Sequence, residues 1–168
     1  MPGSQRLIIA AVAAFTVGAV PVDAAGAFLV QTDNWFVISL TNSCYAANRP
    51  PHEYNYSPYN SLTIHAPKDG GFVFEVAFWP KSFEAGQRYR LSLRIEGRGD
   101  HEIDADAVSD FMLKSRGTAS DAFLKELQTA KALGAKAQYV PEPLSFDTTR
   151  ISEILAHLDN CRRVIRQG

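Results

Sequence analysis

The sequence has almost no net charge, very little sulfur and few long apolar runs. Its 168 residues carry 17 Lys and Arg against 18 Asp and Glu, a formal net charge of −1, with only 2 Cys and 2 Met. A chain so evenly charged lacks the basic field that recruits nucleic acid or an anionic membrane surface. Hydrophobic residues make up 46% of the chain and charged residues 21%, which excludes a fibrous or disordered protein. We therefore expect one folded domain without a nucleic-acid partner.

Familiar catalytic and metal-binding motifs are also missing. The sequence has no Gly-x-Ser-x-Gly, no Ser-x-x-Lys and no glycine-rich phosphate loop, and His52, His65, His101 and His157 lie far apart along the chain. No His-x-x-x-His spacing places two metal ligands on one helical face. We therefore expect no enzyme activity, no metal and no cofactor. The alternative is a small periplasmic hydrolase in which His65 or His101, oriented by a carboxylate, takes a hydroxyl proton.

The one long apolar run lies near the N-terminus. Fourteen largely apolar residues, 7–20, follow a single arginine and precede a stretch of small residues, a pattern typical of a secretory signal peptide. A membrane-spanning helix needs roughly 20 apolar residues, so we expect no membrane insertion after signal cleavage. Cleavage after Ala24 would remove residues 1–24 and leave 25–168 as a single periplasmic or secreted domain. Cleavage after Ala27 is the alternative.

Alternating polar and apolar residues predict a sheet with helices after it. The predicted strands cover residues 34–40, 61–66, 72–79, 87–96, 100–107 and 137–140. Two amphipathic helices are predicted, the first from Thr118 or Ser120 to Leu133 and the second beginning at Asp147 or Thr148. Strands followed by helices predict the α+β class, with an antiparallel β-sheet or β-sandwich, two packed helices and one disulfide.

The two cysteines are predicted to form that disulfide. Cys44 follows the first predicted strand, and Cys161 lies on the apolar face of the last helix. A cysteine pair in an oxidising compartment indicates a structural bridge. Closing a loop of 117 positions would stabilise the fold by about 4 to 5 kcal/mol. The alternative is a reactive cysteine, which only Arg162 and Arg163 beside Cys161 favour.

Carboxylates alternate along the predicted strand 100–107, at Asp100, Glu102, Asp104 and Asp106. With a three-residue turn over 97–99, Arg94 would face Glu102 and Arg90 would face Asp106, so that the acidic stripe is neutralised by its neighbour strand. The alternative is a Ca²⁺ site, although calcium loops usually curl carboxylates round the ion. We expect the neutralised pair of strands.

A proline-containing loop over residues 48–60 holds the best candidate for a binding site. It contains Tyr54, Asn55, Tyr56 and Tyr59. Tyrosine gives wide contact area at low entropic cost, and small polar residues adapt their hydrogen bonds, so this composition is common in binding loops. The alternative is that the rings cover the edge of the core and keep their hydroxyls in water.

Several features together resemble a family of exported bacterial proteins. They are the signal peptide, an early strand containing Trp35, Cys44 shortly after it, the segment 85–93 and a last helix ending in 158–161. In this combination the chain resembles small exported proteins of the invasion-associated locus B type. The resemblance implies a non-enzymatic, β-rich periplasmic or surface protein. We therefore expect a non-catalytic module that binds an envelope or host protein or a glycan.

Overall fold

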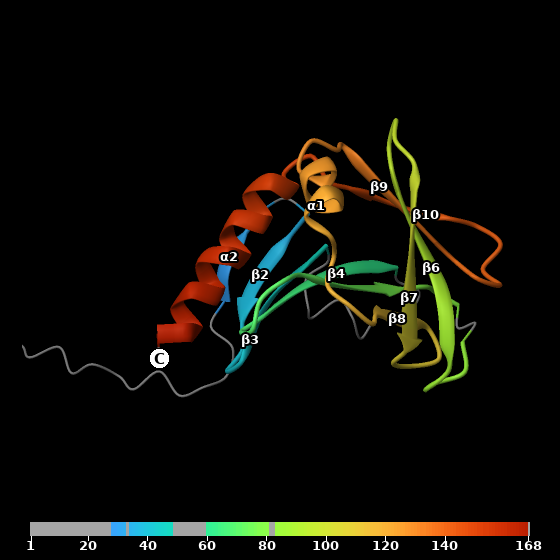
Figure 1. Cartoon of the computed structure of the whole chain (residues 1–168), viewed down its shortest axis with the longest axis horizontal. Coiled ribbons are helices and arrows are strands. Elements are labelled where there is room, and N and C mark those ends of the chain that lie inside the picture. The colour runs from blue at the N-terminus through green and yellow to red at the C-terminus, as the bar shows by residue number, and fades with distance from the viewer. Residues whose placement is uncertain (1–27, 33, 49–59, 81–82, 168) are drawn as a thin grey trace, which may run out of the picture.

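The computed structural model describes residues 28–32, 34–48, 60–80 and 83–167, which fold into one antiparallel sheet with two helices (Figure 1). The predicted signal peptide and residues 49–59 of the predicted tyrosine loop lie outside the described residues. Within the described ranges, no helix is long and apolar enough to cross a membrane. The α+β class and the antiparallel sheet are confirmed, and the ten strands form one continuous sheet.

Twelve elements follow one another along the chain. They are β1 (Phe28–Gln31), β2 (Phe36–Ser39), β3 (Ser43–Ala47), β4 (Ser61–Pro67), β5 (Val73–Ala77), β6 (Arg88–Ile95), β7 (Asp100–Ala107), β8 (Met112–Ser115), α1 (Asp121–Leu127), β9 (Ala132–Ala137), β10 (Leu144–Asp147) and α2 (Ile151–Gln167). The spatial order of the strands is β1-β2-β3-β4-β5-β8-β7-β6-β9-β10.

The predicted helix to Leu133 is wrong in its second half. The Ser120 side chain accepts a hydrogen bond from the Phe123 amide and so begins α1, but the helix ends at Leu127. Leu133 instead lies in β9, which replaces the strand predicted at 137–140 and pairs with β6 and β10. The helical spacing of apolar residues continues through the turn, but two flanking strands offer the backbone of Leu133 a full set of sheet partners.

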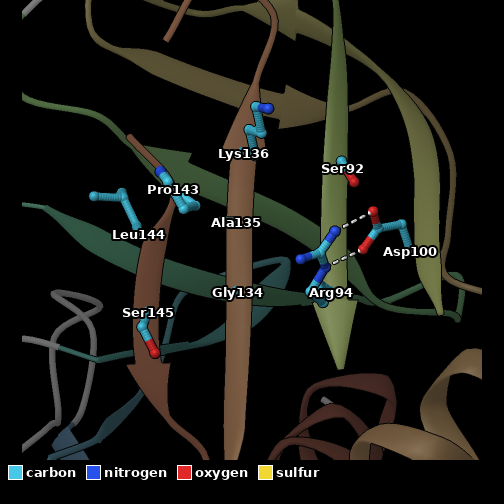
Figure 2. A pocket seen from close by; sticks show the side chains of 9 residues that line it. All are labelled: Ser92, Arg94, Asp100, Gly134, Ala135, Lys136, Pro143, Leu144 and Ser145. Atoms are coloured by element: carbon cyan, nitrogen blue, oxygen red, sulfur yellow. Dashed lines mark hydrogen bonds and ion pairs between the residues drawn. The ribbon is translucent and has the colours of Figure 1, made fainter. Parts of the chain in front are cut away.

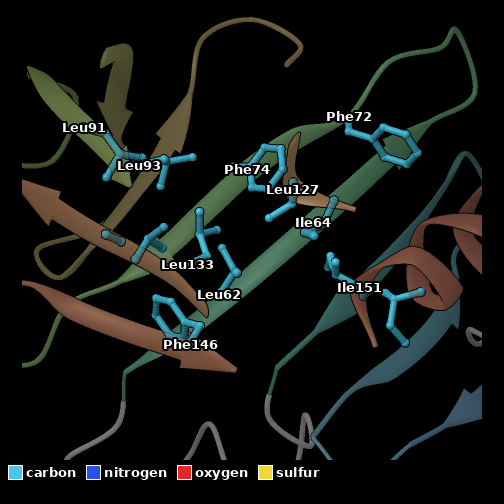
Figure 3. Close-up of a cluster of buried hydrophobic side chains, with 14 of the residues drawn as sticks. Leu62, Ile64, Phe72, Phe74, Leu91, Leu93, Leu127, Leu133, Phe146 and Ile151 are labelled. Atoms are coloured by element: carbon cyan, nitrogen blue, oxygen red, sulfur yellow. The ribbon is translucent and has the colours of Figure 1, made fainter. Parts of the chain in front are cut away.

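The sheet has a buried inner face and a polar outer face. The inner face carries small and large apolar side chains from nearly every strand, including Leu62, Phe74, Leu91 and Leu133. The outer face of β6 and β7 carries the charged side chains that alternate with them. The sheet curls, so that Leu62 of β4, Leu133 of β9 and Phe146 of β10 are directed into the same interior (Figure 3).

Helix α2 packs on the inner face over β2, β3 and β4 (Figure 1). Its buried residues are Ile151, Ile154, Leu155, Leu158 and Cys161, the apolar face predicted from the sequence. Cys161 forms a disulfide with Cys44 of β3, with a Cα–Cα distance of 6.1 Å. Both cysteines are buried, which confirms the structural bridge.

The hairpin of β6 and β7 has a different register from the predicted one. The turn is centred one residue earlier, because the Arg98 amide donates to the Ile95 carbonyl at 3.0 Å and Gly97 takes a positive φ of 73°. Glycine is the residue that adopts this conformation without strain. Each partner is therefore displaced by two positions, and Arg94 faces Asp100 instead of Glu102. Displacement by two keeps every side chain on its predicted face.

Candidate binding surface around Asp100

A hollow opens on the outer face of β6, β9 and β10, with a volume of about 300 Å³ (Figure 2). Its lining residues come from the three strands, the turn before β10 and the start of β7: Ser92, Arg94, Asp100, Gly134, Ala135, Lys136, Pro143, Leu144 and Ser145. Gly134 lies opposite Arg94 in the sheet and contributes no side chain to this face. The missing side chain leaves the space between Arg94 and the β10 residues open. We call this region the outer hollow.

The Arg94 guanidinium and the Asp100 carboxylate form a two-pronged ion pair at the edge of the outer hollow (Figure 2). Arg94 donates from Nε at 2.5 Å and from Nη2 at 2.7 Å, one bond to each carboxylate oxygen. Hydrogen bonding to Arg94 lowers the pKa of the Asp100 carboxyl, and Asp100 in turn raises the pKa of Arg94. Such paired geometry fixes both planar groups in one orientation.

Three polar groups of the outer hollow remain open to a ligand. In the described part of the chain, Lys136 forms no ion pair, and the hydroxyls of Ser92 and Ser145 make no hydrogen bond. The Lys136 charge does lower the pKa of Asp100, so the two groups share one electrostatic environment. Pro143, in the turn before β10, provides an apolar wall on the opposite side. The outer hollow thus combines a cation, hydroxyl groups and apolar surface.

A second hollow continues from the first along β6 and β7. It has a volume of about 510 Å³ and shares Ser92, Arg94, Asp100 and Lys136 with the outer hollow. Its further lining includes Arg90, Glu102 and Gln138. The charged outer face that the sequence predicted as a neutralised stripe is therefore also a concave polar surface.

A third cavity, also of about 510 Å³, lies where β7 and β8 separate in front of α1. His101 lines it from the inner face of β7, its Nε2 lying 3.2 Å from Glu126 Oε2, and its ring contacts Phe123 at 4.8 Å between centroids. Two serines in its wall already have partners: Ser115 Oγ donates to the Gly117 carbonyl, and Ser120 Oγ accepts from the Phe123 amide. A carboxylate therefore orients His101, but neither serine hydroxyl donates to it.

His65 lies elsewhere, on the outer face of β4. Its Nε2 is 3.6 Å from Glu75 Oε2 of β5, and its ring lies 5.9 Å from the ring of Tyr45. Within the described residues, neither His65 nor His101 is hydrogen-bonded to a serine or threonine hydroxyl. The two histidines thus belong to separate places in the fold.

The ion pairs of β7 replace those predicted from the sequence. Asp100 pairs with Arg94, Asp104 lies 3.8 Å from Arg90, and Asp106 lies 3.3 Å from Arg116. Three of the four carboxylates of the stripe are thus paired, with partners other than those predicted, and Glu102 has no ion pair in the described part of the chain. Within the described ranges, no three His, Cys, Asp or Glu side chains are grouped to hold a metal ion.

Sequence patterns found only part of this surface. Arg94 and Asp100 were both expected on the polar face, and Tyr54, Asn55, Tyr56 and Tyr59 lie outside the described residues. Lys136, Pro143 and Ser145 were missed, because their segments meet β6 only through the unrecognised strands β9 and β10. The available signal in the sequence was that Leu133, Ala135 and Ala137 alternate with Gly134 and Lys136.

Comparison with known proteins gives one informative match. No family model matches the sequence, and no curated protein matches it either. Among solved structures, the fold is similar to that of invasion associated protein B from Bartonella henselae, with a TM-score of 0.55 and 12% sequence identity. The match covers 77% of this chain and 94% of that one. The resemblance to the invasion-associated locus B type is therefore confirmed as a likeness of fold.

Proposed function

We propose that the chain is an exported, non-catalytic binding protein of the cell envelope, periplasmic or secreted, and that the outer hollow is its binding surface. The observation that carries the proposal is the Arg94–Asp100 pair in a concave, exposed part of the sheet. General acid–base groups need a pKa near the working pH. The pKa of Asp100 is shifted the other way, so this carboxylate stays ionised and suits recognition.

Two further observations support the compartment. The buried Cys44–Cys161 disulfide is typical of a protein that folds outside the cytoplasm. The fold is similar to that of a protein described as invasion associated, which supports a role in envelope or host interaction. The ligand class we favour is an envelope or host protein or a glycan, contacted through Lys136, the hydroxyls and the apolar wall of the outer hollow.

Charge reversal in the outer hollow tests the proposal. The purified chain is immobilised and exposed to envelope extract and to a glycan array, in parallel with Lys136→Glu and with Lys131→Glu. Lys131 is an exposed lysine that does not line the outer hollow, so its variant controls for net charge. We expect Lys136→Glu to lose a component that the wild type and Lys131→Glu retain. Identical retention by all three proteins would contradict the proposal.

A small hydrolase using His101 is the second candidate function. The observation that favours it is the His101–Glu126 contact inside a cavity that also contains serine hydroxyls. A panel of ester and peptide substrates, tested with wild type, His101→Ala and His65→Ala, decides between the two functions. Turnover that only His101→Ala abolishes would establish this candidate. Equal background rates for the three proteins would support the non-catalytic function.

A further inference from the structure

We propose that the cavity between β7 and α1 is a second binding site, which takes an extended peptide as an added strand on the free edge of β7. The peptide would place basic side chains on the outer face and apolar side chains on the inner face. This site shares Asp100 with the outer hollow, but it lies at the edge of β7 away from β6 and uses main-chain groups.

The edge is free because β7 is longer than its neighbour. β7 covers Asp100–Ala107, whereas β8 ends at Ser115, which lies opposite Ala105. One more bond continues the ladder, from the Arg116 amide to the Asp104 carbonyl at 2.9 Å. Beyond it, in the described part of the chain, no strand pairs with residues 100–103 of β7 on this side.

The segment after β8 turns away from β7 beyond Arg116, because a hydrogen bond near the start of β5 holds it there. A continued ladder would place Thr118 opposite Glu102, but the Ala119 amide donates to the Phe72 carbonyl at 2.8 Å instead. Gly71, with a φ of 71°, allows this approach, because a Cβ there would overlap the Thr118 side chain. The separation of β8 from β7 is thus built into the sequence.

The free main-chain groups of β7 point into the cavity. In an antiparallel strand the amide and carbonyl of one residue point to the same side, and successive residues alternate. Ala107 bonds toward β6 and Asp104 bonds toward β8, so the even-numbered residues Asp100 and Glu102 direct their amide and carbonyl groups to the free edge. A row of such groups is a template for another strand.

The two faces of the edge specify different side chains. On the inner side the cavity is lined by the buried rings of Phe74 and Phe123, together with His101 and Ile103. On the outer side an incoming residue opposite Glu102 would lie among three carboxylates of β7. Glu102 has no ion pair in the described part of the chain, unlike Asp100, Asp104 and Asp106. A basic residue flanked by two apolar residues complements both faces.

A set of matched peptides tests this inference on the purified full chain. The probe is dye-labelled acetyl-Lys-Val-Lys-Val-Lys-amide, followed by fluorescence polarisation. We expect at least roughly tenfold weaker binding when the lysines are replaced by glutamates. We expect a similar loss when the central lysine is N-methylated on its backbone, since that peptide keeps its charge and loses the amide that meets Glu102. Equal affinity for the N-methylated and the unmethylated peptide would overturn the proposal. This comparison leaves the protein unchanged, so a folding defect cannot explain its result.

Substitutions at Glu102 test the same site from the protein side. Glu102→Pro removes a free-edge amide without breaking a bond to β6, and proline is tolerated on such edges. Glu102→Gln removes the charge alone, and Glu142→Gln removes an exposed charge at the β9–β10 hairpin. We expect the wild type and Glu142→Gln to bind the probe peptide equally well. Glu102→Gln should bind it more weakly, and Glu102→Pro most weakly of all. Equal losses at positions 102 and 142 would overturn the site.

Self-association of the chain and cleavage of the probe would each change the interpretation in a defined way. If the chain self-associates and Glu102→Pro makes it monomeric, the occupant is a second copy of the chain and the peptide proposal is wrong. Mass spectrometry of the recovered probe separates this inference from the proposed function. Probe cleavage abolished by His101→Ala would overturn the non-catalytic function and still confirm the cavity as the peptide site.

Discussion

Cys44 and Cys161 show the effect that two residues have on the stability of this fold. Both are buried, and they join β3 to the last helix. Removing a native bridge from a small exported domain typically costs about 2 to 5 kcal/mol. We expect reduction, or Cys161→Ala, to lower the free energy of unfolding in urea by an amount in that range. Reductant should then have no further effect on Cys161→Ala, and two freely labelled thiols in the native unreduced protein would contradict the bridge.

Asp147, at the end of β10, forms an acid-sensitive contact with Asn34, which lies between β1 and β2. Its Oδ1 accepts from the Thr149 backbone amide at 2.9 Å and from the Thr149 hydroxyl, and its Oδ2 accepts from the side-chain Nδ2 of Asn34 at 2.9 Å. These hydrogen bonds lower the pKa of the Asp147 carboxyl, and those from Thr149 have the largest effect. A carboxyl whose pKa is lower in the folded state stabilises the fold above its unfolded pKa, about 3.9, and loses that contribution as the pH falls through the folded value.

We therefore expect Asp147→Asn to flatten the loss of stability below about pH 4. The melting temperature should fall in the variant at neutral pH and converge with the wild type in acid. Thermal melts across the acid range measure this. Glu142→Gln is the control, because Glu142 is exposed and makes no hydrogen bond in the described part of the chain. Parallel curves for wild type and Asp147→Asn would show that the contact has no effect.

At the scale of elements, the register of the β6–β7 hairpin can be tested by mutation. The structure pairs Arg94 with Asp100, whereas the sequence favoured Glu102. A double-mutant cycle with alanine at positions 94 and 100 should show coupling in urea unfolding at low salt, and the coupling should weaken at high salt. The matched cycle at positions 94 and 102 should show none. The reverse result would restore the predicted register.

The elements differ in how well the sequence indicates them. β4, β6 and β7 were predicted, because their residues alternate over seven or eight positions and one face is buried. β3 was missed because Ser43–Ala47 consists of small residues apart from Tyr45, and β8 and β10 because four residues are too few to establish a period. In each missed strand the neighbouring strands determine the conformation. Sequence periodicity alone carries little information there.

At the scale of the whole molecule, the curled sheet has a single core. Leu133 of β9 is fully buried in the same cluster as residues from the first half of the sheet (Figure 3). We expect Leu133→Ala to cost about 2 to 5 kcal/mol and to destabilise both halves together. Trp35 and Trp79 lie in the first half, so fluorescence and circular dichroism should report coincident transitions. Val164→Ala, at an exposed position, is the control, and separate transitions would contradict a shared core.

At this scale, the sequence predicts the fold class but not the curvature of the sheet. Composition and the order of strands and helices were sufficient for α+β, and Cys161 on the apolar helix face was sufficient for the bridge. The curl of the sheet brings together residues such as Asn34 and Asp147, which are 113 positions apart and leave no local pattern in the sequence. Because three strands assemble the outer hollow, it could not be derived before their order was known.

The Cys44–Cys161 bridge also determines how the chain would respond to mechanical tension. It closes a loop with a sequence separation of 117, which contains every strand from β4 to β10. A force that pulls on the two chain ends passes through the sulfur atoms and bypasses that loop. Only β1, β2, the start of β3 and the last turns of α2 lie outside the loop and can be peeled away. The two proposed binding sites lie inside the loop, so they would keep their shape while the segments outside it are peeled away.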